Sequence, residues 1–222
     1  MRYLLILICS FALGSPIAAQ DQFFYTVVKD YFRVNPFTGQ FSAFVNAVKT
    51  DPGLTITRTV NKTDTSLFSI EGDYQSFNPF SIRANKVEMT LGEKQRVLQG
   101  RRPIADTIML YEITGFFDST AQTVKALKKE YKRINNKIKR DLAAQSEAPL
   151  TNIRGIREGA ITNHAKNSNL APPISVIWFV KDDGQLGLLV ALRMKYINNR
   201  AVPSGFLADN LYFYRNILPM FR

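Results

Sequence analysis

Residues 118–143 read DSTAQTVKALKKEYKRINNKIKRDLA, and this stretch decides the fold that the sequence predicts. Its apolar residues recur every three or four positions, which places them on one face of an α-helix. These residues are Ala121, Val124, Leu127, Tyr131, Ile134, Ile138 and Leu142. Side-chain oxygens of Asp118, Ser119 and Thr120 can accept hydrogen bonds from the first free backbone N–H groups. The stretch therefore predicts one long amphipathic helix over 118–143.

The opposite face of this predicted helix is basic. Glu130 is the one acid between Lys125 and Arg140, and like charges four residues apart repel one another along a helix. We therefore predict that an anion binds to this face and to two arginines that follow it in the chain. The predicted anion-binding residues are Lys125, Lys128, Lys129, Lys132, Arg133, Lys137, Arg140, Arg154 and Arg157. The simpler interpretation is a solvated surface helix, because long basic side chains also cover apolar surface with their stems.

Residues 1–19 have the features of a secretory signal peptide: a positive charge at Arg2, a short apolar run, and small residues before a cut after Ala19. We expect the mature chain, residues 20–222, to be secreted or periplasmic. Cys9 is the one cysteine and lies within the predicted signal peptide, so the mature chain is expected to have no disulfide. No run in the mature chain is long and apolar enough to cross a membrane as a helix.

Several other runs have the pattern of a β-strand: some alternate between apolar and polar residues, and 174–181 is nearly continuously apolar, as expected of a central strand buried on both faces. The predicted strands are 54–60, 67–74, 82–91, 107–117, 174–181 and 186–196, with a further short strand within 153–161. The sequence Asp182-Asp183-Gly184 predicts a hairpin turn between the last two. Helical spacing predicts shorter helices over 20–33 and 40–50, before the first strand. Residues 145–173 have no clear period and are expected to be the least regular part.

These elements predict an α+β fold, in which an antiparallel sheet of about six strands packs against the one long amphipathic helix 118–143. Two layouts fit this order of elements. One is a single curved sheet that grips the long helix, and the other is a duplicated unit of helix plus sheet. We expect residues 20–222 to form a single domain or two packed halves, 20–117 and 118–222. The aromatic tail 204–222 is expected to cover a sheet edge.

The formal net charge of +11 at pH 7 indicates a surface that attracts polyanions. Export disfavours nucleic acid and leaves lipid headgroups or acidic glycans as the expected partners. His164 is the single histidine and is expected in a surface loop, so neither a serine triad nor a zinc site is supplied. We expect no catalytic residue, no metal and no cofactor. No feature of the sequence predicts an oligomeric state.

The favoured interpretation is therefore an exported, non-enzymatic protein that binds an anionic partner of the envelope or the extracellular space. Two alternatives remain open. The sheet and the long helix could enclose an apolar pocket that carries a small hydrophobic ligand. A hydrolase that uses paired carboxylates would need two acids on the two sides of a cleft, and the candidates are Glu71, Asp73 and Glu112.

Overall fold

The structure is a computed structural model of the 222-residue chain. It describes residues 27–37, 40–61, 68–95, 107–140, 142–150, 153–165, 173–197 and 200–203. The predicted signal peptide, the first part of the predicted helix 20–33 and the aromatic tail 204–222 lie outside the described residues, so those expectations stay predictions.

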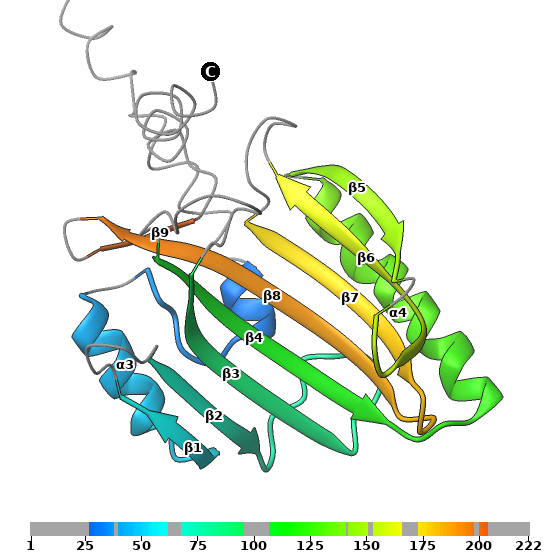
Figure 1. Cartoon of the computed structure of the whole chain (residues 1–222), viewed down its shortest axis with the longest axis horizontal. Helices are drawn as coiled ribbons and strands as arrows, with labels where there is room; N and C mark the ends of the chain where they lie inside the picture. Colours follow the sequence, from blue (N-terminus) through cyan, green and yellow to red (C-terminus); the bar gives the residue numbers. More distant parts are fainter. Residues whose placement is uncertain are drawn as a thin grey trace, which may run out of the picture.

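Nine strands of the described residues form one antiparallel sheet (Figure 1). They are β1 (Leu54–Val60), β2 (Ser69–Tyr74), β3 (Lys86–Gln95), β4 (Thr107–Phe117), β5 (Ala143–Pro149), β6 (Ile156–Ala165), β7 (Ile174–Lys181), β8 (Leu186–Ile197) and β9 (Arg200–Pro203). The order across the sheet is β1-β2-β3-β4-β8-β7-β6-β5, and β9 pairs with the end of β8. The predicted antiparallel pairing is confirmed. Gly184, at a φ of +89°, forms the predicted turn between β7 and β8.

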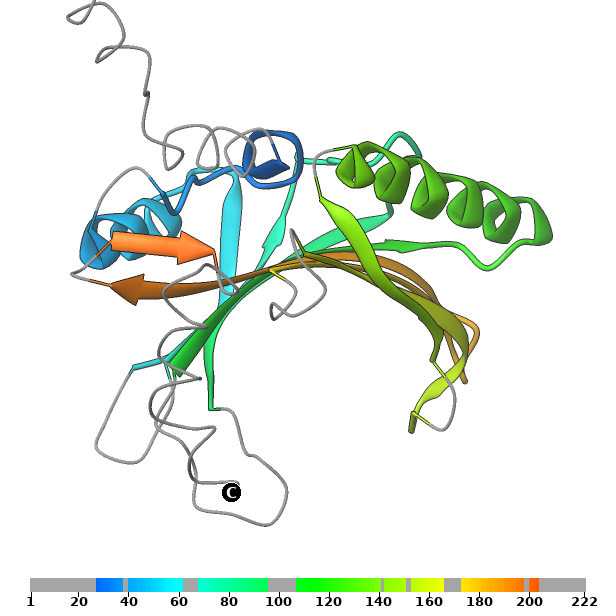
Figure 2. The same ribbon diagram turned by 90° about the horizontal axis from the view of Figure 1, so that it is seen from above.

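Helices α3 (Phe41–Lys49) and α4 (Ala121–Lys139) lie on the same side of the sheet, which bends away from them (Figure 2). Residues 27–31 are also helical and lie on this side. The sequence of one helix followed by four strands occurs twice, as α3 with β1–β4 and α4 with β5–β8. The last strands of the two series, β4 and β8, pair at the centre of the sheet.

The prediction of an about six-stranded sheet packed against one long helix is wrong. The sheet has nine strands, because β5 and β9 were not predicted and the short strand expected within 153–161 is the ten-residue strand β6. Helix α4 packs on the β5–β8 half, whereas α3 and residues 27–31 cover the other half. The ring centroid of Phe32, which follows the N-terminal helical segment, lies 4.5 Å from that of Tyr111 on β4. The ring centroid of Phe44 on α3 lies 5.5 Å from the same tyrosine ring. The β1–β4 half therefore has helical cover of its own.

Strands β5 and β6 fall largely in the region that was expected to be irregular. The sequence of β5, AAQSEAP, has little of the branched or aromatic character that favours strands. It is nevertheless paired along its length with β6, from Ala143 opposite Ala165 to Pro149 opposite Ala160. Partner strands rather than local preference therefore decide the conformation here.

Helix α4 is shorter than the predicted 118–143 at both ends. Thr120 is extended (φ −117°, ψ 154°), and its side-chain oxygen accepts a hydrogen bond of 3.1 Å from the backbone N–H of Thr123. The Asp118 carboxylate instead accepts a hydrogen bond of 2.5 Å from the Asn85 side chain. At the other end Ala143 already belongs to β5, so the helix stops at Lys139.

We expect Thr120→Ala to lower the free energy of unfolding by about 1 kcal/mol, because it removes the acceptor for one N–H group of the first turn. The matched change Ser119→Ala should cost a few tenths of a kcal/mol at most, since Ser119 is exposed and provides no cap. Urea unfolding followed by circular dichroism measures both. Equal losses from the two variants would contradict the assignment of Thr120 as the cap.

The core lies between the helices and one face of the sheet, and the predicted apolar stripe of α4 is buried in it from Leu127 onward, whereas Ala121 is exposed. Leu127, Ile134 and Ile138 are at most 1% exposed and belong to the same cluster as the inward residues of β7 and β8. This packing turns the opposite side of α4 toward solvent. No helix within the described ranges is both long and apolar enough to span a lipid bilayer.

Candidate functional site

The exposed side of α4 carries a row of cations along nearly the whole helix. At 3.6 residues per turn these side chains fall within a sector of about 100°, opposite the buried stripe, and span about 22 Å. We call them the basic row; its members are Lys125, Lys129, Lys132, Lys139 and Arg140. All five are exposed, and none makes an ion pair with any residue that the structure describes. Four of them were predicted as anion-binding residues, and Lys139 is the addition.

Two of the predicted anion-binding lysines are instead engaged within the protein. The ammonium group of Lys128 lies 2.7 Å from a carboxylate oxygen of Glu158 on β6, and 4.5 Å from the ring centroid of Trp178 on β7. Lys137 lies 2.5 Å from a carboxylate oxygen of Asp30, in the N-terminal helical segment. Their charges are thus partly neutralised by partners that are distant in sequence.

Arg133, a third predicted residue, is held by the one acid of α4. The Glu130 carboxylate accepts hydrogen bonds from the Arg133 guanidinium at 2.6 and 2.7 Å, and from the backbone N–H of Ser81 at 2.8 Å. The Ser81 hydroxyl is a further donor to it. The Glu130 side chain is only 2% exposed. Burial would raise its pKa, but the hydrogen bonds from Arg133 and Ser81 outweigh burial and hold the pKa below its ordinary value.

A role for Glu130 inside the protein was missed from the sequence, although a signal for it exists. Glu130 stands three residues after Leu127 and four before Ile134, so it belongs to the apolar side of the helix and not to the basic one. A lone carboxylate on a buried stripe requires hydrogen-bonding partners. Here the partners are Arg133 and the segment between β2 and β3.

Arg154 and Arg157, the last two predicted residues, lie in and just after the turn between β5 and β6. Both are exposed. The turn contains Gly155 at a φ of +84°, a left-handed conformation that favours glycine. Glu158, next to Arg157, is the residue that pairs with Lys128 of α4. The two arginines therefore stand on a hairpin that is tied to α4 but are not members of the basic row.

His164 does not lie in a surface loop, and that expectation is wrong. It belongs to β6, is fully buried, and its Nε2 lies 2.7 Å from the side-chain oxygen of Asn135 on α4. Burial and, secondarily, the charge of Lys139 lower the pKa of His164 from 6.5 to about 4. The other ring nitrogen, Nδ1, has no hydrogen-bonding partner within the part of the chain that the structure describes. At neutral pH the imidazole is thus an uncharged part of the interior.

The three acids considered for a hydrolase lie on the face of the sheet away from the helices. Glu71 and Glu112 are both paired with Thr90 in the strand register, so two strand spacings, about 9.5 Å, separate their backbones. A carboxylate oxygen of Glu71 lies 3.5 Å from the guanidinium of Arg58. A carboxylate oxygen of Asp73 lies 3.3 Å from the ammonium group of Lys86 on β3. The described ranges contain no cluster of three acidic, histidine or cysteine side chains suited to a metal.

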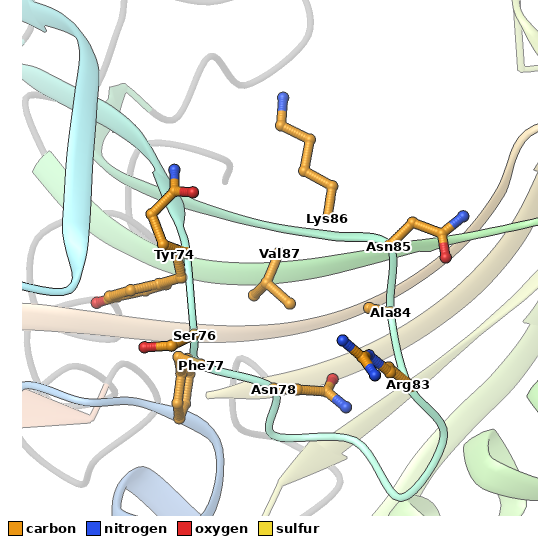
Figure 3. A pocket seen from close by; sticks show the side chains of 10 residues that line it. Tyr74, Ser76, Phe77, Asn78, Arg83, Ala84, Asn85, Lys86 and Val87 are labelled. Carbon is orange, nitrogen blue, oxygen red and sulfur yellow. The ribbon is translucent and has the colours of Figure 1, made fainter.

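A pocket of about 510 Å³ lies where β2 ends and β3 begins (Figure 3). It is lined by Tyr74, Gln75, Ser76, Phe77, Asn78, Arg83, Ala84, Asn85, Lys86 and Val87. A second pocket, of about 380 Å³, shares Asn85 and Lys86 with it. None of the three acids considered for a hydrolase lines either pocket, and neither pocket lies between α4 and the sheet. The two alternatives, a carrier of a hydrophobic ligand between sheet and helix and a hydrolase with paired carboxylates, therefore stay predictions. Neither of the two pockets supports them.

Comparisons of the chain with protein-family models, with curated proteins and with solved structures found no match.

Proposed function

We propose that this is an exported, non-enzymatic protein that attaches to an anionic surface through the basic row of α4. The observation that carries the proposal is the separation of roles among the basic residues of this helix. Lys128, Arg133 and Lys137 have carboxylate partners, while the five members of the basic row have none among the described residues. Glu130, the one acid of α4, is turned inward, so nothing on the exposed side of the helix offsets the positive charge.

A lipid headgroup surface suits this row better than a deep or shaped ligand. Four of its five members are lysines, which act as point charges on flexible stems. The other residues on the exposed side include Ala121, Gln122 and Asn136, so no large apolar side chain is available for insertion into a bilayer. Attachment would then be peripheral and electrostatic, and salt would weaken it. An acidic glycan would meet the same cations and is the alternative partner.

The test is cosedimentation of the mature chain with vesicles of phosphatidylcholine that contain about a third phosphatidylglycerol, at low and high salt. Each lysine near such a surface contributes about 1 kcal/mol, so changing Lys125, Lys129 and Lys132 together to Gln should weaken binding roughly 100-fold. Vesicles of phosphatidylcholine alone should bind neither protein.

A matched control removes three exposed cations that are not on α4, namely Lys29, Lys49 and Arg58. Both triple variants have the same net charge. The proposal is supported if the control keeps most of the binding and the α4 variant loses it. Equal weakening by the two variants would show that total charge, not the basic row, governs attachment. Binding to a sulfated glycan column without binding to anionic vesicles would favour the glycan.

A further inference from the structure

The pocket between β2 and β3 carries one uncompensated positive charge. Arg83 is exposed, and among the residues that the structure describes no hydrogen bond or ion pair neutralises its guanidinium group. Lys86, the other cation in the lining, lies 2.8 Å from Glu88 and 3.3 Å from Asp73. None of the described residues that line the pocket is acidic. An anionic group in the pocket would therefore meet a guanidinium with all its donors available.

The same pocket presents hydrogen-bond acceptors whose orientation is fixed. The amide nitrogen of Asn78 donates to the carbonyl oxygens of Phe80 and Ile82, at 3.2 and 2.9 Å. The amide nitrogen of Asn85 donates to the Asp118 carboxylate at 2.5 Å. These partners accept only, so each amide must keep its nitrogen toward them and its oxygen free. Asn78 and Arg83 both point into the space that the connection encloses (Figure 3).

Two aromatic residues, Tyr74 and Phe77, stand on the β2 side of the lining. The rings of Tyr74 and Phe77 lie 5.1 Å apart in an edge-to-face arrangement. The guanidinium of Arg33 lies 5.9 Å from the centroid of each ring and so helps to fix them. A volume of about 510 Å³ is within the range of small-molecule sites, which combine apolar surface with a few placed polar groups. The lining of this pocket is mainly polar, so it matches a ligand that carries one anionic group and several hydroxyl groups.

We propose that this pocket binds a hexuronate, a six-carbon sugar that carries a carboxylate. Arg83 holds the carboxylate, and the amide oxygen of Asn78 accepts a hydrogen bond from a hydroxyl group. A phosphate fits less well, because the amide oxygen of Asn78 would face its oxygens and a single unpaired cation of the described lining would have to neutralise it. The basic row does not line the pocket, so this site goes beyond the proposed function and stands or fails separately.

The test is a titration of the mature chain with glucuronate, glucose and acetate, followed by amide NMR shifts and calorimetry. Glucuronate should bind saturably in the low millimolar range, and glucose and acetate at least ten-fold more weakly. A short oligogalacturonide that binds more tightly than the monomer would identify a polysaccharide as the source, whereas equal affinity would identify a free sugar acid. Each result supports the pocket as a hexuronate site.

Two variants keep the proposal open to contradiction. Arg83→Gln should weaken glucuronate binding at least ten-fold, because it removes the one cation of the described lining that is available to the carboxylate. Arg58→Gln removes an exposed arginine on β1 and should change nothing, as should the triple glutamine variant of the basic row. The proposal is wrong if glucuronate binds no more tightly than glucose, or if Arg83→Gln, with an unchanged circular dichroism spectrum, binds it like the parent.

Discussion

Glu130→Gln is expected to lower the free energy of unfolding by about 3 kcal/mol, although the residue stands on the most charged helix of the chain. The change preserves the shape of the side chain and removes its charge. Arg133 then loses its carboxylate partner, and one of the two Ser81 donors faces an amide instead of a carboxylate oxygen. Breaking a buried pair from one side commonly costs 3–5 kcal/mol; the lower end applies because the Arg133 side chain is 46% exposed and can be rehydrated.

The Lys128–Glu158 pair provides the matched control. It has a short contact of 2.7 Å, but its side chains are 42% and 53% exposed. Glu158→Gln should therefore cost less than about 1 kcal/mol, as exposed ion pairs usually do. Guanidinium or urea unfolding at neutral pH compares the two variants directly. Similar losses from both would show that burial of Glu130 adds nothing to its pairing.

The pKa of Glu130 sets the pH range of this stabilisation. Its pKa is lower in the folded protein than in the unfolded chain. The contribution is therefore complete above the pKa of an unfolded glutamate, and it disappears as the pH falls through the lower, folded-state pKa. The difference in stability between the parent and Glu130→Gln should accordingly shrink in acid. A difference that stays constant down to pH 3 would contradict the assignment of a stabilising charge.

Local sequence periodicity was sufficient for much of the fold. The spacing of Leu127, Ile134 and Ile138 gave the buried side of α4. The alternation in β1 and β8 and the nearly continuous apolar run of β7 gave those strands close to their observed limits. Periodicity failed for β5, because the partner strand β6 imposes the extended conformation on a sequence with no preference for it. It also failed for the helical cover, since nothing local indicates which half of a sheet a helix packs on.

The candidate site, like the fold, could be predicted from the sequence only in part. That α4 has a basic side follows from its sequence alone. The sequence alone does not show which of these cations remain available to a partner. The carboxylates that engage Lys128 and Lys137 lie 30 and 107 residues away in the chain. The hexuronate pocket could not be predicted either, since the orientation of the Asn78 amide depends on hydrogen bonds that form only when the β2–β3 connection is folded.

Acidification from pH 6.5 to pH 4 is expected to destabilise the protein by about 3 kcal/mol through His164 alone. The pKa of this histidine is about 4 in the folded protein, against 6.5 for an ordinary histidine. Between these values the unfolded chain takes up a proton that the folded protein does not. The free energy of unfolding therefore falls as the pH falls through this window, and the loss is complete near pH 4.

The surroundings of His164 explain why the charged form is disfavoured. With the Asn135 oxygen beside it, Nε2 carries the hydrogen of the neutral ring, and the buried Nδ1 would be the site of the added proton. A proton there would find no acceptor among the described residues. The residues paired with His164 on the neighbouring strands are Ala144 and Ile174, which are uncharged, and Lys139 of α4 opposes a second positive charge.

NMR titration of the imidazole measures this pKa directly, because the chain contains one histidine. We expect a midpoint near pH 4, and the pH dependence of unfolding should lose this component in His164→Gln. Lys139→Gln should raise the midpoint by less than one pH unit, since burial is the larger cause of the shift and the lysine the smaller one. A parent midpoint near 6.5 would contradict the buried neutral imidazole. Because Lys139 is also a member of the basic row, saturating anionic vesicles should raise the His164 midpoint in the parent but not in Lys139→Gln, which links the buried histidine to the proposed binding surface.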